Sequence, residues 1–214
     1  MKNYKYLFFD FDGTLCDTYE GVCEILDLTF AHFGVEVDKS TYSRYIGPPL
    51  SDTFSNLLGK EKTAEAVKFF QENYCDKKAI FKTKLYDGIA PTIEKLKEMG
   101  YFIGVATCKK HEEAEMLLKY FGIEKNIAFV SGLCYNIRET KRAVLQYAMD
   151  KLGLNTDECL MIGDTIFDAE GAASVGMDCL MCLWGFGDYK NMSCPSIVAN
   201  IEKPSQIIDF VNKK

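Results

Sequence analysis

Two aspartates near the N-terminus are spaced so that they could act together on a phosphate group. They lie in the run Asp10-Phe11-Asp12-Gly13-Thr14, separated by one residue. In an extended chain, such a pair points the same way. An aspartate is ionised at neutral pH, so it could attack phosphorus without a base to activate it, while its neighbour handles a proton. An ordinary Asp-Gly turn would use the same residues, so this run alone leaves both interpretations open.

Three further segments offer groups that suit phosphate or a hard metal ion. Thr107 is followed by Cys108, Lys109 and Lys110, and a hydroxyl with backbone amides at a helix start can bind phosphate. Lys141 begins a predicted helix, where its ammonium could neutralise phosphate charge. Asp164 and Asp168 can share one helical face, and carboxylate oxygens are ligands that Mg²⁺ prefers. Helix caps and exposed charges would explain each segment equally well by itself.

The predicted strands and helices explain how these segments could meet. Strands are expected at 6–9, 102–106, 159–162 and 179–184, with weaker candidates at 127–130 and 197–198. Helical spacing of apolar residues is found at 89–99, 111–121, 141–152, 168–175 and 205–211. This alternation predicts an α/β fold, a Rossmann-like parallel-sheet core with helices on both faces. Ligands of such sheets bind beyond the carboxyl ends of the strands, where all four segments are expected.

Residues 18–83 interrupt the alternation of strands and helices. Helices are expected at 21–33, 50–58 and 64–74, with a break at Gly47-Pro48-Pro49 and no convincing strand. We therefore predict an all-helical cap, 18–83, inserted into an α/β catalytic core formed by 1–17 and 84–214. The cap would govern which ligand fits. Arg44 and the Gly47 turn are candidates for facing the site, although a surface arginine and a plain helix break are equally compatible with the sequence.

Composition excludes several classes of protein. The net charge of −6 and the pI of about 5.1 argue against a nucleic-acid surface. No run reaches the roughly 18 apolar residues that a membrane span needs, and the N-terminus does not resemble a secretory signal, so a cytoplasmic protein is expected.

The nine cysteines have irregular spacing, which favours reduced core residues over disulfides. The pair Cys179 and Cys182 falls in a predicted strand, where the two side chains would face opposite sides and could not share zinc.

The four segments together resemble the haloacid dehalogenase-like superfamily of phosphatases. The resemblance rests on DxDGT at Asp10 to Thr14, on Thr107, on Lys141 and on GDxxxD at Gly163 to Asp168. Their order and spacing agree with that family over essentially the whole chain. The helical insert resembles the family's type-one cap, and the presence of Asp12 argues against the dehalogenases, which lack the second aspartate.

Weaker signals concern the branch within the superfamily. The chain most resembles the phosphoglycolate phosphatase group. Three segments resemble a 5′-nucleotidase-like branch: Tyr45 to Leu50, Arg138, and Trp184 to Gly187.

The resemblance implies an Mg²⁺-dependent phosphomonoester hydrolase that works through an aspartyl-phosphate. Asp10 would be the nucleophile, and Asp12 would first protonate the leaving group and then deprotonate water. Thr107 and Lys141 would hold phosphate oxygens. The residues implied at the metal are Asp10, the Asp12 main-chain carbonyl and Asp164. Asp168 would either support the water molecules bound to the metal or orient Lys141. Residues implied or suggested at the substrate are Gly13, Thr14, Arg44, Cys108, Lys109 and Arg138.

The sequence leaves alternatives open. A sugar phosphomutase of the β-phosphoglucomutase type would share every motif, and a non-catalytic phosphate-binding protein could have the same fold. The expected substrate is a small phosphate ester, either phosphoglycolate-like or a nucleoside 5′-monophosphate. No nucleic-acid or membrane partner is expected, and a monomer or weak dimer would be ordinary.

Overall fold

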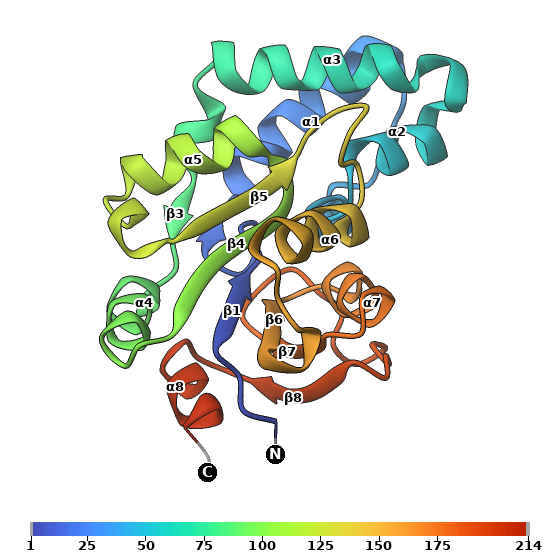
Figure 1. Ribbon diagram of the computed structural model, residues 1–214. Coiled ribbons are helices and arrows are strands. Elements are labelled where there is room, and N and C mark those ends of the chain that lie inside the picture. The colour runs from blue at the N-terminus through green and yellow to red at the C-terminus, as the bar shows by residue number, and fades with distance from the viewer. Residues whose placement is uncertain (1, 213–214) are drawn as a thin grey trace.

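Six parallel strands form the central sheet (Figure 1). The computed structural model describes residues 2–212. In spatial order the strands are β5 (Phe129–Leu133), β4 (Phe102–Lys110), β1 (Tyr6–Phe9), β6 (Cys159–Gly163), β7 (Asp178–Cys182) and β8 (Ile197–Ile201). Every neighbouring pair is parallel, as the alternation of strands and helices predicted. Because β1 lies in the middle, its carboxyl end is flanked by those of β4 and β6.

Helices cover both faces of the sheet, which confirms the predicted α/β architecture. Alternate residues of β1 point to opposite faces: Leu7 and Phe9 join one buried cluster and Phe8 joins the other. The first face is covered by α4 (Ile89–Glu98), α5 (His111–Tyr120) and α8 (Ser205–Val211). The second is covered by α6 (Lys141–Leu152) and α7 (Ile166–Ser174).

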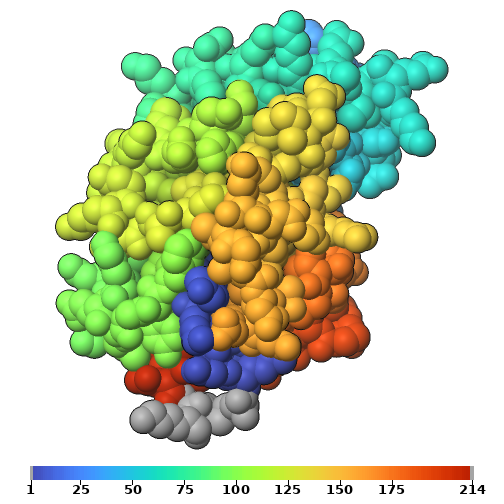
Figure 2. All heavy atoms as spheres, viewed as in Figure 1, coloured from blue at the N-terminus to red at the C-terminus, as the bar shows by residue number. Residues whose placement is uncertain are grey.

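The segment 18–83 contains helices and no strand, as predicted. It comprises α1 (Tyr19–Phe33), η1 (Lys39–Tyr45), α2 (Leu50–Leu58), α3 (Lys60–Asp76) and η2 (Ala79–Lys82). Figure 1 shows α1, α2 and α3 above the sheet, at the opposite end from the two chain termini, and Figure 2 shows the cyan cap segment seated on the core. This is the inserted helical cap of the prediction; its residue boundaries stay a prediction.

A short strand pair joins the cap to the core. β2 (Cys16–Asp17) precedes the cap, β3 (Lys84–Leu85) follows it, and the two pair antiparallel. The two connections therefore run side by side. Strands of two residues give no periodic signal, which is why the sequence did not reveal this pair.

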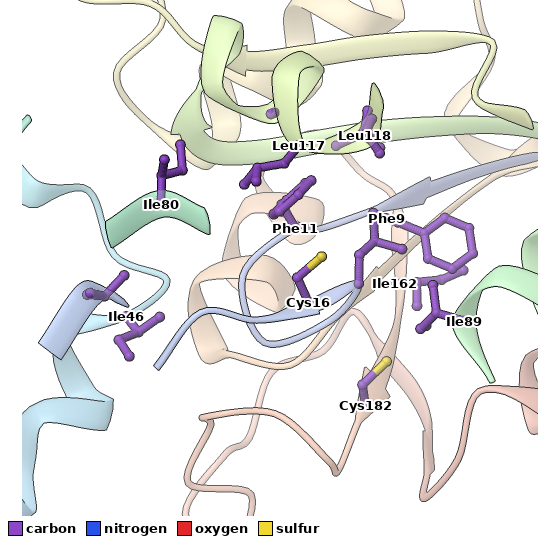
Figure 3. Packing of buried hydrophobic residues seen from close by; sticks show 14 of the residues in the cluster. Phe9, Phe11, Cys16, Ile46, Ile80, Ile89, Leu117, Leu118, Ile162 and Cys182 are labelled. Atoms are coloured by element: carbon purple, nitrogen blue, oxygen red, sulfur yellow. The ribbon is translucent and has the colours of Figure 1, made fainter. Parts of the chain in front are cut away.

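One apolar cluster continues from the core into the cap. Figure 3 shows Ile46 and Ile80 of the cap segment near Phe11 and Leu117 of the core. All four side chains are at most 3% exposed. Burial of apolar surface between the two parts therefore favours the closed arrangement seen here.

The structure corrects several predicted boundaries. β5 spans Phe129–Leu133 instead of 127–130, and α3 spans Lys60–Asp76 instead of 64–74. Three further corrections concern elements beside the site. β4 continues to Lys110 instead of ending at 106, with an irregular register between Ala106 and Lys110. β7 ends at Cys182, which leaves Trp184 in the following loop, and α7 begins at Ile166, before Asp168. Two short 3-10 turns, η3 (Glu124–Asn126) and η4 (Thr156–Glu158), complete the fold. Among the helices described, none has the length and apolar character to cross a membrane.

Candidate active site

Asp10 lies at the centre of the sheet's carboxyl edge. It directly follows β1, and its backbone N–H donates to the Ile162 carbonyl at 2.9 Å, which continues the pairing with β6. The Asp10 residue is only 2% exposed. The backbone therefore fixes this carboxylate at the point where three strand ends meet.

Lys141 holds Asp10 from the neighbouring helix. Its Nζ lies 2.8 Å from Asp10 Oδ1 and 2.7 Å from Asp168 Oδ1, and it donates to the Ala106 carbonyl at 3.0 Å. Burial opposes the charge on Lys141, but the two carboxylates outweigh it and raise the pKa of Lys141 above its ordinary value. The ammonium is thus charged and fixed between both aspartates.

A glycine in α7 makes room for this lysine. A Cβ at Gly171 would lie 2.4 Å from Lys141 Cγ, closer than two carbon atoms can approach. Glycine within a helix costs about 1 kcal/mol relative to alanine. Here it lets the lysine stem pass close to the helix.

Asp164 is held by two loops, one after β1 and one after β7. Thr14 Oγ1 donates to Asp164 Oδ1 at 2.9 Å, and the Phe186 backbone N–H donates to Oδ2 at 2.8 Å. Gly13 adopts a φ of +80°, and a Cβ there would lie 2.1 Å from Asp164 Oδ2. Trp184 Nε1 donates to the Thr14 carbonyl at 3.1 Å, so the loop after β7 is tied to the loop after β1.

Asp168 has both carboxylate oxygens engaged by protein groups. Oδ2 accepts from the backbone N–H and the hydroxyl of Thr165, at 3.0 and 2.9 Å, and Oδ1 faces Lys141. Thr165, not Asp164, is therefore the N-cap of α7, with Asp168 closing a capping box. This arrangement suits Asp168 for orienting Lys141.

Three buried carboxylates lie together, and Lys141 contacts two of them, Asp10 and Asp168. One oxygen from each of Asp10, Asp164 and Asp168 lies within 4.8 Å of the others, and all three residues are buried. Burial, with repulsion from Asp168, raises the pKa of Asp10 to about 7; burial also raises the pKa of Asp164 well above its ordinary value. A buried group of oxygen donors with excess negative charge is the environment that a hard divalent cation such as Mg²⁺ favours.

Asp12 is paired with a different lysine. Lys109 Nζ lies 3.1 Å from Asp12 Oδ1, and the two side chains are 4% and 15% exposed. Burial opposes the charge on Lys109, but Asp12 outweighs it and raises the pKa of Lys109 above its ordinary value. Asp12 therefore lies outside the group formed by Lys141, Asp10 and Asp168, here called the Lys141 cluster, and it lines the cavity beneath the cap.

Thr107 lies within β4 and does not cap α5, whose N-terminal residue is preceded by Lys110 without a side-chain cap. The Lys109 backbone N–H donates to Thr107 Oγ1 at 3.1 Å, so the hydroxyl hydrogen is free to donate elsewhere. Cys108 lines the adjacent cavity, and burial raises the pKa of its thiol to about 12, which keeps it neutral.

A cavity of about 60 Å³ lies between the cap and Asp12. The core side contributes Asp12, Cys108, Lys109, Lys110, Glu113 and Tyr135. The cap side contributes Val22, Tyr45, Ile46, Gly47, Pro48, Leu50, Phe70, Gln71 and Tyr74. Among these described residues, none from the cap is charged. Gln71 Nε2 donates to Tyr135 Oη across the boundary.

The two arginines predicted at the substrate lie elsewhere. Arg44 is exposed and lines a second cavity of about 460 Å³, together with Thr165 and Phe186. Arg138 donates to the Gly132 carbonyl at 3.3 Å and stacks on Tyr147, with its guanidinium carbon 3.8 Å from the ring centroid. Of the predicted cap candidates, the Gly47 turn lines the cavity beside Asp12 and Arg44 does not.

Sequence reasoning missed several residues of the site. It did not identify the backbone of Phe186 at Asp164, nor the cap side chains Tyr74 and Gln71. The glycines around Phe186 were a usable signal, because a Cβ at Gly185 would lie 2.3 Å from Asp164 Oδ2. Tyr74 and Gln71 lie on a helix whose face toward the core no motif marks.

Comparison with known proteins agrees with this geometry. Residues 7–182 match the family model of haloacid dehalogenase-like hydrolases. A 5′-nucleotidase of Pseudomonas aeruginosa is 30% identical over 86% of this chain and 85% of its own. The tyrosine-protein kinase PtkA of Mycobacterium tuberculosis is also 30% identical, over 90% of this chain and 67% of its own. A haloacid dehalogenase-like hydrolase from Streptococcus pneumoniae superposes with a TM-score of 0.87 at 29% identity, covering 98% of this chain and 99% of that one.

The chain therefore belongs to the haloacid dehalogenase-like hydrolase family, as its motifs predicted. Within that family it is an enzyme of the phosphatase class.

Proposed function

We propose that this phosphatase is an Mg²⁺-dependent phosphomonoesterase that acts on a small phosphorylated metabolite through an aspartyl-phosphate on Asp10. The observation that supports this most directly is the placement of the Asp10 carboxylate. It is buried at the centre of the sheet edge, 2.8 Å from Lys141 Nζ, with Thr107 in the last part of β4 and Asp164 directly after β6.

The first step is attack of an Asp10 carboxylate oxygen on phosphorus, with cleavage of the ester P–O bond. The anionic nucleophile and the phosphate repel each other, by about 4 kcal/mol per pair of unit charges about 4 Å apart at an effective dielectric of about 20. Lys141 offsets part of this repulsion and orients Asp10. The free hydroxyl hydrogen of Thr107 is available to a phosphate oxygen. Positioning and electrostatics of this kind account for most of the catalysis of phosphoryl transfer.

Asp12 handles the proton in both halves of the reaction. Its carboxyl group gives a proton to the departing ester oxygen, then takes one from the water that cleaves the aspartyl-phosphate. Asp12 is suited to this because it lies outside the Lys141 cluster and lines the cavity beneath the cap. The net reaction consumes one water and releases an alcohol and phosphate.

Asp10, Asp164 and the Asp12 main-chain carbonyl would hold Mg²⁺, and Asp168 would orient Lys141. The fit rests on the excess of buried carboxylates and on the contacts that fix both oxygens of Asp164. When bound, the ion supplies positive charge to the phosphate and to the nucleophile.

Mg²⁺ is expected to stabilise the folded protein. Bound Mg²⁺ should relieve the repulsion among the buried carboxylates and so raise the temperature of the unfolding midpoint. At a free Mg²⁺ concentration about 100 times the dissociation constant, the free energy of unfolding should increase by about 2.7 kcal/mol. Thermal unfolding is followed in EDTA and with added Mg²⁺, with KCl of matched ionic strength as control. Asp164→Asn should lose most of the Mg²⁺ effect. Equal stabilisation of parent and variant, or full phosphatase activity after exhaustive chelation, would contradict the metal assignment.

The residues that line the cavity favour a substrate whose leaving group is uncharged and rich in apolar surface. The cap wall is formed by side chains such as Tyr45, Phe70 and Tyr74, without a cation for a second anionic group. On the core side, Lys109 is already paired with Asp12, and the charge of Lys110, the other lysine of the lining, is offset by Glu113 of the same lining. These features favour a nucleoside 5′-monophosphate over phosphoglycolate, whose carboxylate would require its own partner.

A panel of phosphate esters ranked by kcat/KM tests this preference. Nucleoside 5′-monophosphates should exceed phosphoglycolate, and the opposite order would overturn the proposed substrate class. The panel includes a sugar phosphate assayed for isomerisation, since the mutase alternative shares every motif. It also includes a phenolic acceptor, because a relative at 30% identity carries a kinase name. Transfer to either acceptor at a rate above hydrolysis would replace the hydrolase assignment.

A further inference from the structure

Lys109 joins the cap, the core and Asp12 at one point. It is the last residue but one of β4 and lines the cavity, and its ammonium lies 3.1 Å from Asp12 Oδ1. The same ammonium lies 5.1 Å from the ring centroid of Tyr74, on cap helix α3, and 5.7 Å from that of Phe11. Its side chain is 4% exposed, so solvent does not screen these contacts.

The backbone of Lys109 is also fixed. Its N–H donates to Thr107 Oγ1, one of the groups assigned to phosphate. Lys109 is thus tied to the phosphate-binding hydroxyl through its main chain and to Asp12 through its side chain.

We propose that Lys109 is a positioning residue that fixes the Asp12 carboxyl group for proton transfer to the leaving group, and that Tyr74 of the cap holds the Lys109 ammonium in place. The proposal rests on the phosphatase function and on the role of Asp12 given above. Lys109 occupies Oδ1, so the oxygen left to face the ester is Oδ2. Asp12 enters this step protonated on Oδ2, and that proton moves to the ester oxygen as the P–O bond breaks and the bond from Asp10 to phosphorus forms. The carboxylate left on Asp12 then pairs with the Lys109 ammonium until it takes a proton back from the water that cleaves the aspartyl-phosphate.

The consequence depends on the leaving group. A p-nitrophenolate leaves as a stabilised anion and needs little protonation, whereas an alkoxide leaves slowly unless it receives a proton. p-Nitrophenyl and p-nitrobenzyl phosphate differ by one methylene and keep the same ring. The ratio of their kcat/KM values therefore reports the need for leaving-group protonation, with little contribution from differences in binding. Because kcat/KM covers only the steps up to cleavage of the ester, the later hydrolysis of the aspartyl-phosphate does not affect this ratio.

Lys109→Met is expected to lower kcat/KM for p-nitrobenzyl phosphate about tenfold or more beyond its effect on p-nitrophenyl phosphate. Asp12→Asn should show the same selectivity, and adding Lys109→Met to it should cause little further selective loss, because both changes act on one step. Tyr74→Leu should produce a smaller loss with the same selectivity. Lys109→Arg, which keeps the charge, should restore part of the p-nitrobenzyl activity.

Lys110→Met is the matched control, since Lys110 lines the same cavity without an ion pair to Asp12. It should change both esters in equal proportion. Thermal unfolding establishes that each variant is folded. Equal losses on both esters in folded Lys109→Met would overturn the positioning role, while the phosphatase assignment would stand as long as the parent hydrolyses both esters. A parent that hydrolyses neither would overturn both.

Discussion

Asp10→Asn is expected to abolish turnover, by at least about 10⁴-fold in kcat, while the fold stays intact. The amide oxygen is a poor nucleophile and cannot form the aspartyl-phosphate. The variant keeps the size of the side chain and leaves Lys141 paired with Asp168. Initial rates on a good phosphatase substrate, with intact mass measured to exclude deamidation back to aspartate, give the result.

The stability of this variant separates a chemical from a structural effect. Asn removes one of three crowded buried carboxylates, so the unfolding midpoint in EDTA should equal or exceed that of the parent. Asp150→Asn, at an exposed aspartate of α6, is the control and should leave activity unchanged. Near-parental turnover by an undeamidated Asp10→Asn protein would remove Asp10 from the role of nucleophile.

The sequence predicted those site residues whose positions are set by the ends of strands. Asp10 and Asp164 follow short apolar runs that are buried in adjacent parallel strands, so their proximity follows from the topology alone. Lys141 was predicted from its place at a helix start. Its passage beside Gly171 to reach two aspartates depends on how α6 packs against α7, which no local pattern encodes.

The cap was harder to predict at the level of side chains. Its helices have apolar spacing that predicts their existence, but that spacing does not say which residues face Asp12. Arg44 lies in the 3-10 segment η1, whose period differs from that of an α-helix, and it points to a different cavity from the Gly47 turn three residues later. The pairing of Lys109 with Tyr74 joins residues 35 positions apart across two parts of the fold, so only the structure could reveal it.

Lys141→Met is expected to destabilise the protein by about 3 kcal/mol or more in EDTA, and to lower kcat by at least about 100-fold. The substitution leaves Asp10 and Asp168 buried without the ammonium that now contacts both. Removing one partner of a buried ion pair leaves an uncompensated charge, which costs far more than an exposed pair contributes. Chemical denaturation in EDTA measures the stability, and ester hydrolysis measures the rate.

The control is Arg142→Met, which removes an exposed cation from the next position of the same helix and should change stability by less than about 0.5 kcal/mol. Mg²⁺ should raise the stability of Lys141→Met by more than that of the parent, because in the variant the ion would be the principal compensating charge. A Lys141→Met protein as stable as the parent in EDTA would mean that Lys141 does not compensate a buried negative charge on Asp10. In that case the attraction between Lys141 and ionised Asp10, on which the nucleophile's orientation depends, would be absent.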